Sequence, residues 1–371
     1  MVSTHQRARI IAGIALIASV VAAALLYFLY RTGLNGAQPK APEVFGIVLP
    51  GANDSSGWNK SVFDGFAKAV QGVDGRLVFA QDAGSNVERV NTAVKLLIGR
   101  GAKTVILAAP GYSAICNSLI SSNSATDFAA FADPNSARNL SSYWIRIYQV
   151  SYIAGYTAAA MSTTGVLGYV AASADPVSLR NINAFAMGAK AVRTDAVVKV
   201  IFTGDPYDRQ KAAAAADRLV DSGKAEVLAY LLFNDAVSEV AKRRRVKYIG
   251  FLEDPDKYDK GLMLGMINVN WERFADLIIK NRLSRVKNHE VRWYGIEDDI
   301  VWFDNRCNYL TTAVQNHIKS FEASFAAGHE IFSGDIKDVD GTYRCRSGEV
   351  LSDETLSKAV FWLVDGVEAV E

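Results

Sequence analysis

The sequence predicts a two-lobed α/β fold built on parallel sheets, and three observations support this prediction. From about residue 44 onward, short apolar runs rich in β-branched residues alternate with amphipathic stretches of helical period. The alternation occurs in two series, which are separated by a stretch of small residues. The chain has 371 residues, half of them apolar, and is therefore long enough for two lobes that each have a core.

The first series predicts strands in VFGIVLP, LVFAQD, TVILAAP and FAAFAD, with helices from Ser61 to Val73 and from Val87 to Arg100. Apolar runs that are each followed by a helix are typical of parallel strands covered on both faces. The small-residue helix from Val150 to Met161 is predicted at the crossing between the lobes.

The second series predicts strands in GVLGYVAA, VVKVIFTGD, VLAYLLF, VKYIGF and LMLGMINVNW. The last quarter predicts a helix from Thr311 to Ala327, a hairpin around Asp340 and Gly341, and a closing helix over 354–367. One lobe would comprise about 44–145 with 272–300, and the other about 162–264 with 301–350, so that residues 44–371 form one two-lobed domain.

The N-terminal segment departs from this globular pattern. Residues 10–30 are an uncharged run long enough to span a bilayer as a helix, with Tyr and Phe near its end and Arg31 after it. We expect an uncleaved transmembrane anchor, or alternatively a cleaved signal, at 10–30. Residues 1–9 would be cytoplasmic and 31–43 a flexible linker. This arrangement places the protein in the cell membrane as a single-pass protein with its main domain extracytoplasmic.

Composition argues against several classes of function. The formal charge is +1 and basic residues are spread along the chain, so the sequence indicates no basic surface of the kind that binds nucleic acid. Four scattered histidines and three cysteines form no metal-binding spacing, and no phosphate-binding glycine motif or nucleophile motif occurs, so we expect no cofactor and no enzyme. The run Glu297-Asp298-Asp299 is interpreted as a solvated turn. Cys307 and Cys345 could pair in an oxidising compartment.

Ligands of open parallel sheets collect at the carboxyl ends of the strands, and several informative residues follow predicted strands. Trp58 and Asn59 follow the first strand, Asp133 ends the fourth, and Tyr207 and Asp254 follow strands of the second lobe. Aromatic rings, amides and carboxylates suit a flat, hydrogen-bonding ligand, and a sugar would fit nearly as well. The alternatives are a lid over the first helix for Trp58, a turn cap for Asp133, and packing within its own lobe for Tyr207.

Several stretches resemble the basic membrane protein (BMP) family of substrate-binding proteins. They are the loop DSSGWN, the segment SYWIRIYQVSYIAGYTAAAMSTTGVLGYVAA followed by INAFAMGAKAV, and the C-terminal GHEIFSGDIKDVDGTYRCRSGEVLSDETLSKAVFWLVDGVE. The resemblance implies a type I periplasmic-binding fold with two lobes and a hinge. It also implies that the protein delivers a purine nucleoside or base to an ABC transporter permease. An alternative is a ligand-sensing or accessory domain that regulates a membrane partner without transport.

By position, the resemblance implies that Trp58 and Tyr207 sandwich the base, with Asn59 and Asp133 at its edge. INVNW resembles the strand that leads into the last crossing, which adds Asn270 and Trp271, and also Asn268, where the family's nucleoside binders have a lysine. In the segment GFLED the ribose-binding carboxylate of the family is altered or displaced, which leaves Asp254 as the candidate. The lipid-attachment cysteine of the family is absent.

Overall fold

The structure is a computed structural model that describes residues 4–34, 41–53, 57–134, 136–253, 259, 261–283, 290–305 and 309–370. Within the segment 4–34, side chains are described for residue 13 and residues 15–31. The chain divides into the units Met1–Pro42 and Glu43–Glu371, and each is described here by itself.

The first unit consists of one long helix, α1 (Thr4–Leu34). Large apolar side chains that the structure describes between Leu16 and Tyr30 are exposed. Among the residues that the structure describes, no helix combines the length and the hydropathy needed to cross a membrane. The membrane anchor expected at 10–30 stays a prediction.

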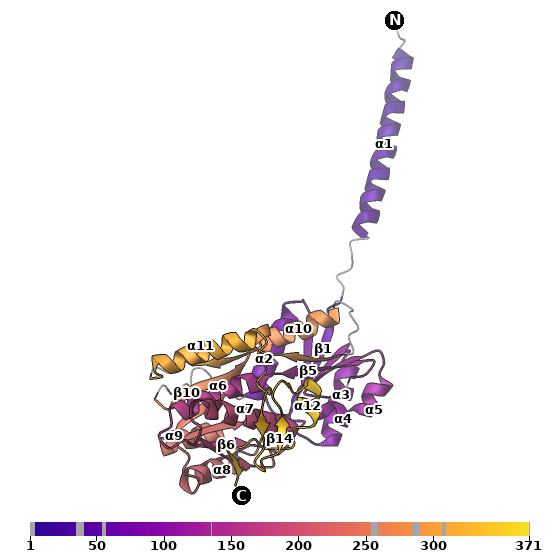
Figure 1. Cartoon of the computed structure of the whole chain (residues 1–371). Coiled ribbons are helices and arrows are strands. Elements are labelled where there is room, and N and C mark those ends of the chain that lie inside the picture. The colour runs from indigo at the N-terminus through magenta and orange to yellow at the C-terminus, as the bar shows by residue number, and fades with distance from the viewer. Residues whose placement is uncertain are drawn as a thin grey trace. The chain divides into compact units, whose positions relative to one another are not determined.

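The first lobe of the second unit is built on a parallel sheet with the order β11-β5-β4-β3-β1-β2. Strands β1 and β5 of this sheet are labelled in Figure 1. Its described strands are β1 (Val44–Val48), β2 (Arg76–Ala80), β3 (Thr104–Leu107), β4 (Asp127–Phe131), β5 (Leu140–Ile145) and β11 (Val291–Tyr294). Its helices are α2 (Trp58–Gln71), α3 (Val87–Gly99), α4 (Tyr112–Ile115), α5 (Asn117–Ser122) and α10 (Trp271–Leu283).

The strands of this sheet are covered on both faces. Phe45 and Ile47 of β1 pack with Phe66 of α2, whereas their neighbour Val48 belongs to a separate cluster that contains Leu97 of α3. Alternate side chains of a strand point to opposite faces, so helices on both sides are needed to bury them. This burial confirms the sequence-based expectation of helix-covered parallel strands in this lobe.

The second lobe is built on a sheet with the order β12-β10-β9-β8-β6-β7-β15. Its described strands are β6 (Val166–Ala171), β7 (Val197–Phe202), β8 (Val227–Leu231), β9 (Lys247–Phe251), β10 (Met263–Val269), β12 (Val301–Asp304) and β15 (Val367–Ala369). Its helices are α6 (Ile147–Ala160), α7 (Pro176–Val192), α8 (Arg209–Asp221), α9 (Ala236–Arg244), α11 (Thr312–Ala326) and α12 (Asp353–Lys358).

The chain passes from one sheet to the other at three places in the described residues. Strand β5 leads through α6 to β6, β10 leads through α10 back onto α2, and β11 leads through a short 3-10 helix, η2 (Ile296–Asp298), to β12. Helix α6 packs closely on α7, because Gly155 and Gly188 each face a backbone carbonyl of the other helix, with no room for a Cβ. Three crossings of this kind are an arrangement that can act as a hinge.

Three expectations from the sequence need correction. Strand β12 pairs antiparallel with β10, so the second sheet is mixed rather than entirely parallel. Strand β5 was not expected, although SYWI within it is an apolar strand-like run. The closing helix expected over 354–367 ends at Lys358, and Val367–Ala369 form β15, which pairs with β7.

The C-terminal segment leaves the helical conformation because it gains other hydrogen bonds. The side-chain amide of Asn183, in α7, donates to the carbonyl of Trp362 at 2.9 Å and accepts from the backbone N–H of Val364 at 2.9 Å. Asn183 is fully buried, so both bonds form away from water. The expected hairpin is present, as β13 (Ile336–Lys337) paired antiparallel with β14 (Tyr343–Cys345).

Candidate functional site

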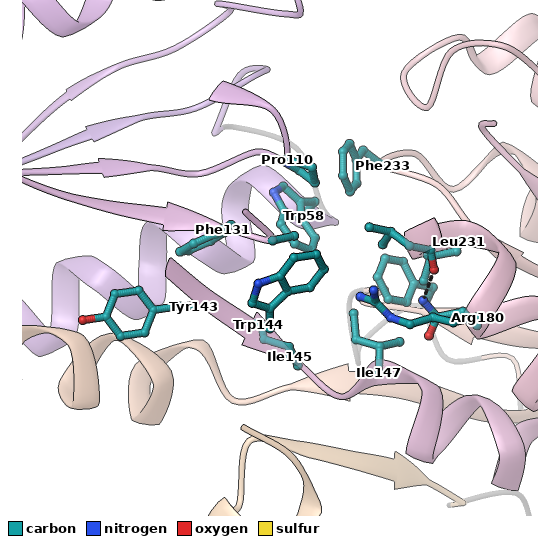
Figure 2. Close-up of a pocket in the computed structure, with 14 residues that line it drawn as sticks. Trp58, Pro110, Phe131, Tyr143, Trp144, Ile145, Ile147, Arg180, Leu231 and Phe233 are labelled. Carbon is teal, nitrogen blue, oxygen red and sulfur yellow. Dashed lines mark hydrogen bonds between the residues drawn. The ribbon is translucent and has the colours of Figure 1, made fainter. Parts of the chain in front are cut away.

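A pocket lies between the two lobes, at the carboxyl ends of strands from both sheets (Figure 2). It holds about 560 Å³ of empty space, part of it open to solvent. Its walls are mostly apolar and aromatic, and they come from the first lobe, from the crossing helix α6 and from the second lobe. The lining residues are Trp58, Pro110, Phe131, Ala132, Tyr143, Trp144, Ile145, Ile147, Val177, Arg180, Asn181, Leu231, Phe233 and Phe251.

Trp58 is the first residue of α2 and is 7% exposed. Its indole Nε1 donates a hydrogen bond to the carbonyl of Ala108, just after β3, at 3.0 Å. The indole ring centroid lies 4.7 Å from that of Phe233, which follows β8 in the other lobe. Trp58 is therefore both anchored to its own lobe, as a lid would be, and exposed to the pocket, as a ligand contact would be.

Five aromatic residues of the lining were not predicted from the sequence. Phe131 ends β4, Tyr143 and Trp144 lie in β5, Phe233 follows β8, and Phe251 ends β9. Each is an apolar residue at or near the carboxyl end of a strand, and this position is the signal that could have identified them. Figure 2 shows Phe131, Trp58 and Trp144 on the wall of the first lobe and Phe233 across from them.

Asn59 and Asp133 lie beside the pocket but do not line it. Asn59 is buried, and its Oδ1 accepts a hydrogen bond from the backbone N–H of Gly51 at 3.1 Å. The backbone carbonyl of Asp133 accepts from the indole Nε1 of Trp144 at 2.7 Å. In these contacts Asn59 fixes the loop after β1, and the carbonyl of Asp133 fixes the orientation of Trp144; their role at the edge of a ligand stays a prediction.

The residues predicted around the last crossing lie behind the lining. Asn268 is buried within β10, and Asn270 caps α10 by accepting from the backbone N–H of Arg273 at 3.0 Å. Trp271 stacks on Phe131, with centroids 5.6 Å apart, and its buried Nε1 has no hydrogen-bond partner among the described residues. Trp271 thus supports the aromatic wall from the core.

Tyr207, expected as the facing aromatic, packs against Phe233 with centroids 5.2 Å apart and is not part of the lining. Burial raises the pKa of its hydroxyl. The aromatic residue that faces Trp58 across the pocket is Phe233, which follows β8 and lines the pocket. Asp254 lies outside the described residues.

The nearest described carboxylate at this end of β9 is Glu253, which is turned into its own lobe. Its Oε1 accepts a hydrogen bond from the hydroxyl of Tyr230 at 2.7 Å, and its Oε2 lies 3.6 Å from the Nζ of Lys242. Burial raises the pKa of Glu253, and the Tyr230 bond partly opposes that rise. Glu253 is not part of the pocket lining.

Apart from the tyrosine and tryptophan side chains, two polar side chains line the pocket, and both come from α7. The hydroxyl of Tyr143 points away from the pocket in Figure 2. Asn181 is 1% exposed; its Nδ2 donates to the carbonyl of Val177 at 2.7 Å, and its Oδ1 accepts from the hydroxyl of Ser151 at 3.3 Å. Arg180 is 2% exposed, and burial lowers its pKa to about 10, so it is positively charged at neutral pH. Among the described residues, no carboxylate lines the pocket.

No cluster of three or more potential metal ligands occurs in the part of the chain that the structure describes. Cys345 is buried and forms no disulfide with a described residue, and burial raises the pKa of its thiol. Cys307 lies outside the described residues, so its pairing with Cys345 stays a prediction. The site can enclose a flat, largely apolar ligand and offer it a positively charged donor.

Comparison with known proteins agrees with this geometry. Residues 43–334 match the family model Bmp, described as ABC transporter substrate-binding protein PnrA-like. The chain is 30% identical to a purine-binding protein of Brucella abortus over 62% of this chain and 66% of that protein. It is 26% identical to a putative ABC transporter glucose-binding protein of Haloferax volcanii, over 62% of this chain and 56% of that protein. The chain thus spans slightly less than two thirds of the length of these relatives.

Among solved structures, the chain resembles an ABC transporter system solute-binding protein from Conexibacter woesei. The TM-score is 0.62 and the identity 16%, with 77% of this chain and 97% of that chain covered. At this identity the likeness concerns the fold, and it confirms the expectation of a periplasmic-binding architecture with parallel-sheet lobes.

Proposed function

Because the chain belongs to the Bmp family of ABC transporter substrate-binding proteins, we propose that it captures a purine-type ligand between its lobes and delivers it to an ABC transporter permease. The observation that carries the proposal is the pair of aromatic side chains, Trp58 and Phe233, which approach the pocket from opposite lobes. Two facing rings are suited to the two faces of a planar heterocycle. The Brucella relative, a purine-binding protein, supports the same ligand class.

Binding would require a change in the distance between the lobes. The ring centroids of Trp58 and Phe233 are 4.7 Å apart, whereas a base stacked between them needs about 7 Å, or two van der Waals separations of roughly 3.5 Å. The lobes would have to open by about 2 to 3 Å to admit the ring. We propose that the three crossings supply this hinge motion and that the ligand favours the state in which it contacts both rings.

A sugar ligand fits the pocket less well than a base. A sugar presents hydroxyl groups around its whole edge, and each that is buried needs a hydrogen-bonding partner. Apart from the tyrosine and tryptophan rings, the polar side chains of the lining are Arg180 and Asn181, and the amide of Asn181 already donates one hydrogen bond and accepts one within the protein. A purine buries two apolar faces and needs partners along part of its edge only.

We further propose that residues 10–30 anchor the protein in the cell membrane and leave the ligand-binding domain outside the cytoplasm. The support is the uncharged run in the sequence and the continuous helix Thr4–Leu34, whose described apolar side chains are exposed. Arg7 and Arg9 precede the run, as expected for the cytoplasmic end of an anchor.

The ligand proposal is tested by calorimetric titration of the full-length chain in detergent with adenine, hypoxanthine, guanine and their nucleosides, and with glucose and ribose. Saturable binding of at least one purine, with no heat from either sugar, is the expected result. A folded protein that binds a sugar and no purine would overturn the proposal. The anchor is tested separately, by membrane fractionation of cells that express the chain with and without residues 1–40.

A further inference from the structure

Arg180 is a buried cation in the wall of the pocket. It lies in the second turn of α7 and lines the space between the lobes although it is only 2% exposed. Figure 2 shows its side chain at the wall of the second lobe, near Ile147 and Leu231 and across from Trp144. Burying a guanidinium is unfavourable unless its charge and its N–H groups find partners.

The described protein groups satisfy this guanidinium only in part. Its Nη1 donates to the carbonyl of Leu356 at 3.1 Å, and its buried Nε has no hydrogen-bond partner among the described residues. The nearby ion pairs of the described chain belong to another arginine, Arg146, which contacts Asp353 and Glu297. Since a guanidinium has five N–H donors, Arg180 keeps donors that the described residues do not use.

Aromatic rings compensate part of the charge without using these donors. The guanidinium carbon lies 4.8 Å from the ring centroid of Trp144 and 5.1 Å from that of Trp293. A cation–π contact is an attraction to the ring electrons and needs no oxygen or nitrogen acceptor for the N–H groups. The N–H groups of Arg180 that no described residue accepts from are therefore left for a ligand.

Most other side-chain donors of the lining are engaged or turned away. The indole N–H of Trp58 bonds to the carbonyl of Ala108, and that of Trp144 bonds to the carbonyl of Asp133. Figure 2 shows the hydroxyl of Tyr143 pointing away from the pocket. The amide of Asn181 donates one hydrogen bond and accepts one within the protein. Arg180 is the one cation of the described lining, and it donates hydrogen bonds and cannot accept them.

We propose that Arg180 is a specificity-determining residue that recognises two adjacent acceptors on the ligand edge, and that the ligand is accordingly a 6-oxopurine rather than a 6-aminopurine. This inference rests on the proposed function. The O6 and N7 atoms of hypoxanthine or guanine form such an acceptor pair, and arginine binds it in a bidentate manner. Adenine places an amino donor at the same position, where it would face the N–H groups of Arg180, and its edge is matched by an amide instead.

A purely structural role would give a different outcome. In that role Arg180 would only hold the C-terminal segment through Leu356 and support the indoles, so its replacement would lower stability without changing ligand preference. Arg146 is a matched control, because it also lies over Trp293, at 5.3 Å, and also binds the C-terminal segment, through Asp353. Arg146 does not line the pocket.

The test is calorimetric titration of the full-length chain, as wild type and as R180Q, R180K and R146Q, with hypoxanthine, guanine and adenine. Wild type should bind the oxopurines at least about tenfold more tightly than adenine, the scale of discrimination by one bidentate pair. R180Q should lose or reverse this ratio, because glutamine matches the edge of adenine, R180K should weaken oxopurine binding, and R146Q should keep the ratio.

Three results would overturn the inference, and they separate it from the proposed function. Equal or tighter binding of adenine by wild type would refute oxopurine selection while leaving purine binding in place; this comparison needs no variant and does not depend on whether R180Q folds. An unchanged ratio in a folded R180Q or R180K would assign Arg180 the structural role alone. If no purine binds to folded wild type, the proposed function fails together with the inference.

Discussion

Replacing Trp58 separates its two possible roles, as a lid and as a ligand contact. The side chain is 7% exposed, donates one hydrogen bond to Ala108, and contacts Phe233 across the pocket. Trp58→Ala removes all three features. Loss of a buried aromatic side chain costs about 3 to 5 kcal/mol of unfolding free energy. Loss of one stacking face for a base costs a further 1 to 3 kcal/mol of binding free energy, or about a 5- to 150-fold weaker affinity.

Phe274→Ala is the matched control for this substitution. Phe274 is fully buried, packs edge-on against Phe131 at a centroid distance of 5.3 Å, and does not line the pocket. Its truncation should lower the free energy of unfolding by the same 3 to 5 kcal/mol, with little change in affinity once the protein is folded. Trp58→Phe should retain stacking and lose about 1 kcal/mol of stability from the hydrogen bond to Ala108.

The assay combines denaturant unfolding with calorimetric titration of the purine that wild type binds best, at a temperature where every variant is folded. We expect Trp58→Ala to weaken both stability and affinity, and Phe274→Ala to weaken stability alone. If both variants lose the same stability and both keep wild-type affinity, the reasoning that Trp58 stacks on the ligand is refuted, and Trp58 is a lid.

Three further predictions concern the scaffold. A Cβ at Gly155 would overlap the carbonyl of Phe185, so Gly155→Ala should lower the unfolding free energy by about 1 to 3 kcal/mol in denaturant titrations, whereas Gly99→Ala, with open space around it, should not. Asn183→Ala should cost about 1 to 3 kcal/mol and increase hydrogen exchange in β15, because it leaves two buried backbone groups unpaired. Burial raises the pKa of Glu253, so the folded state takes up a proton more readily than the unfolded state. The unfolding free energy of wild type relative to Glu253→Gln should therefore increase as pH falls from 7 toward 4.5 and decrease as pH rises. The opposite slope would contradict the burial argument.

The alternating strands and helices were predictable because each strand of a helix-covered parallel sheet is a short apolar run that ends near a helix signal. The helix after the first strand was predicted from Ser61, and α2 begins three residues earlier, at Trp58. The end of the chain did not, because residues 360–369 are held by the distant side chain of Asn183 and by pairing with β7, and neither contact has a local signature. The antiparallel pairing of β12 with β10 also lacks a local signature, because α10, β11 and η2 lie between the two strands in the chain.

The site was predicted in part. Trp58 was identified because it follows the first strand, and the structure places it in the pocket. Phe233 was hidden inside a predicted strand, and Arg180 was hidden in a helix interior, where only the packing of one lobe against the other decides which side chains reach the pocket. Asn59 and Asn270 fix a loop and cap a helix in the structure, and amides in these roles occupy the same positions after strands as ligand contacts do, so the sequence does not distinguish the two roles.

The most direct test of a purine site between the lobes is the crystal structure of the protein with the purine that binds it most tightly. We expect the ring to lie between Trp58 and Phe233, with interplanar spacings of about 3.5 to 4 Å on each side and with the edge of the ring toward Arg180. A purine bound elsewhere, or one that contacts a single lobe, would contradict this expectation.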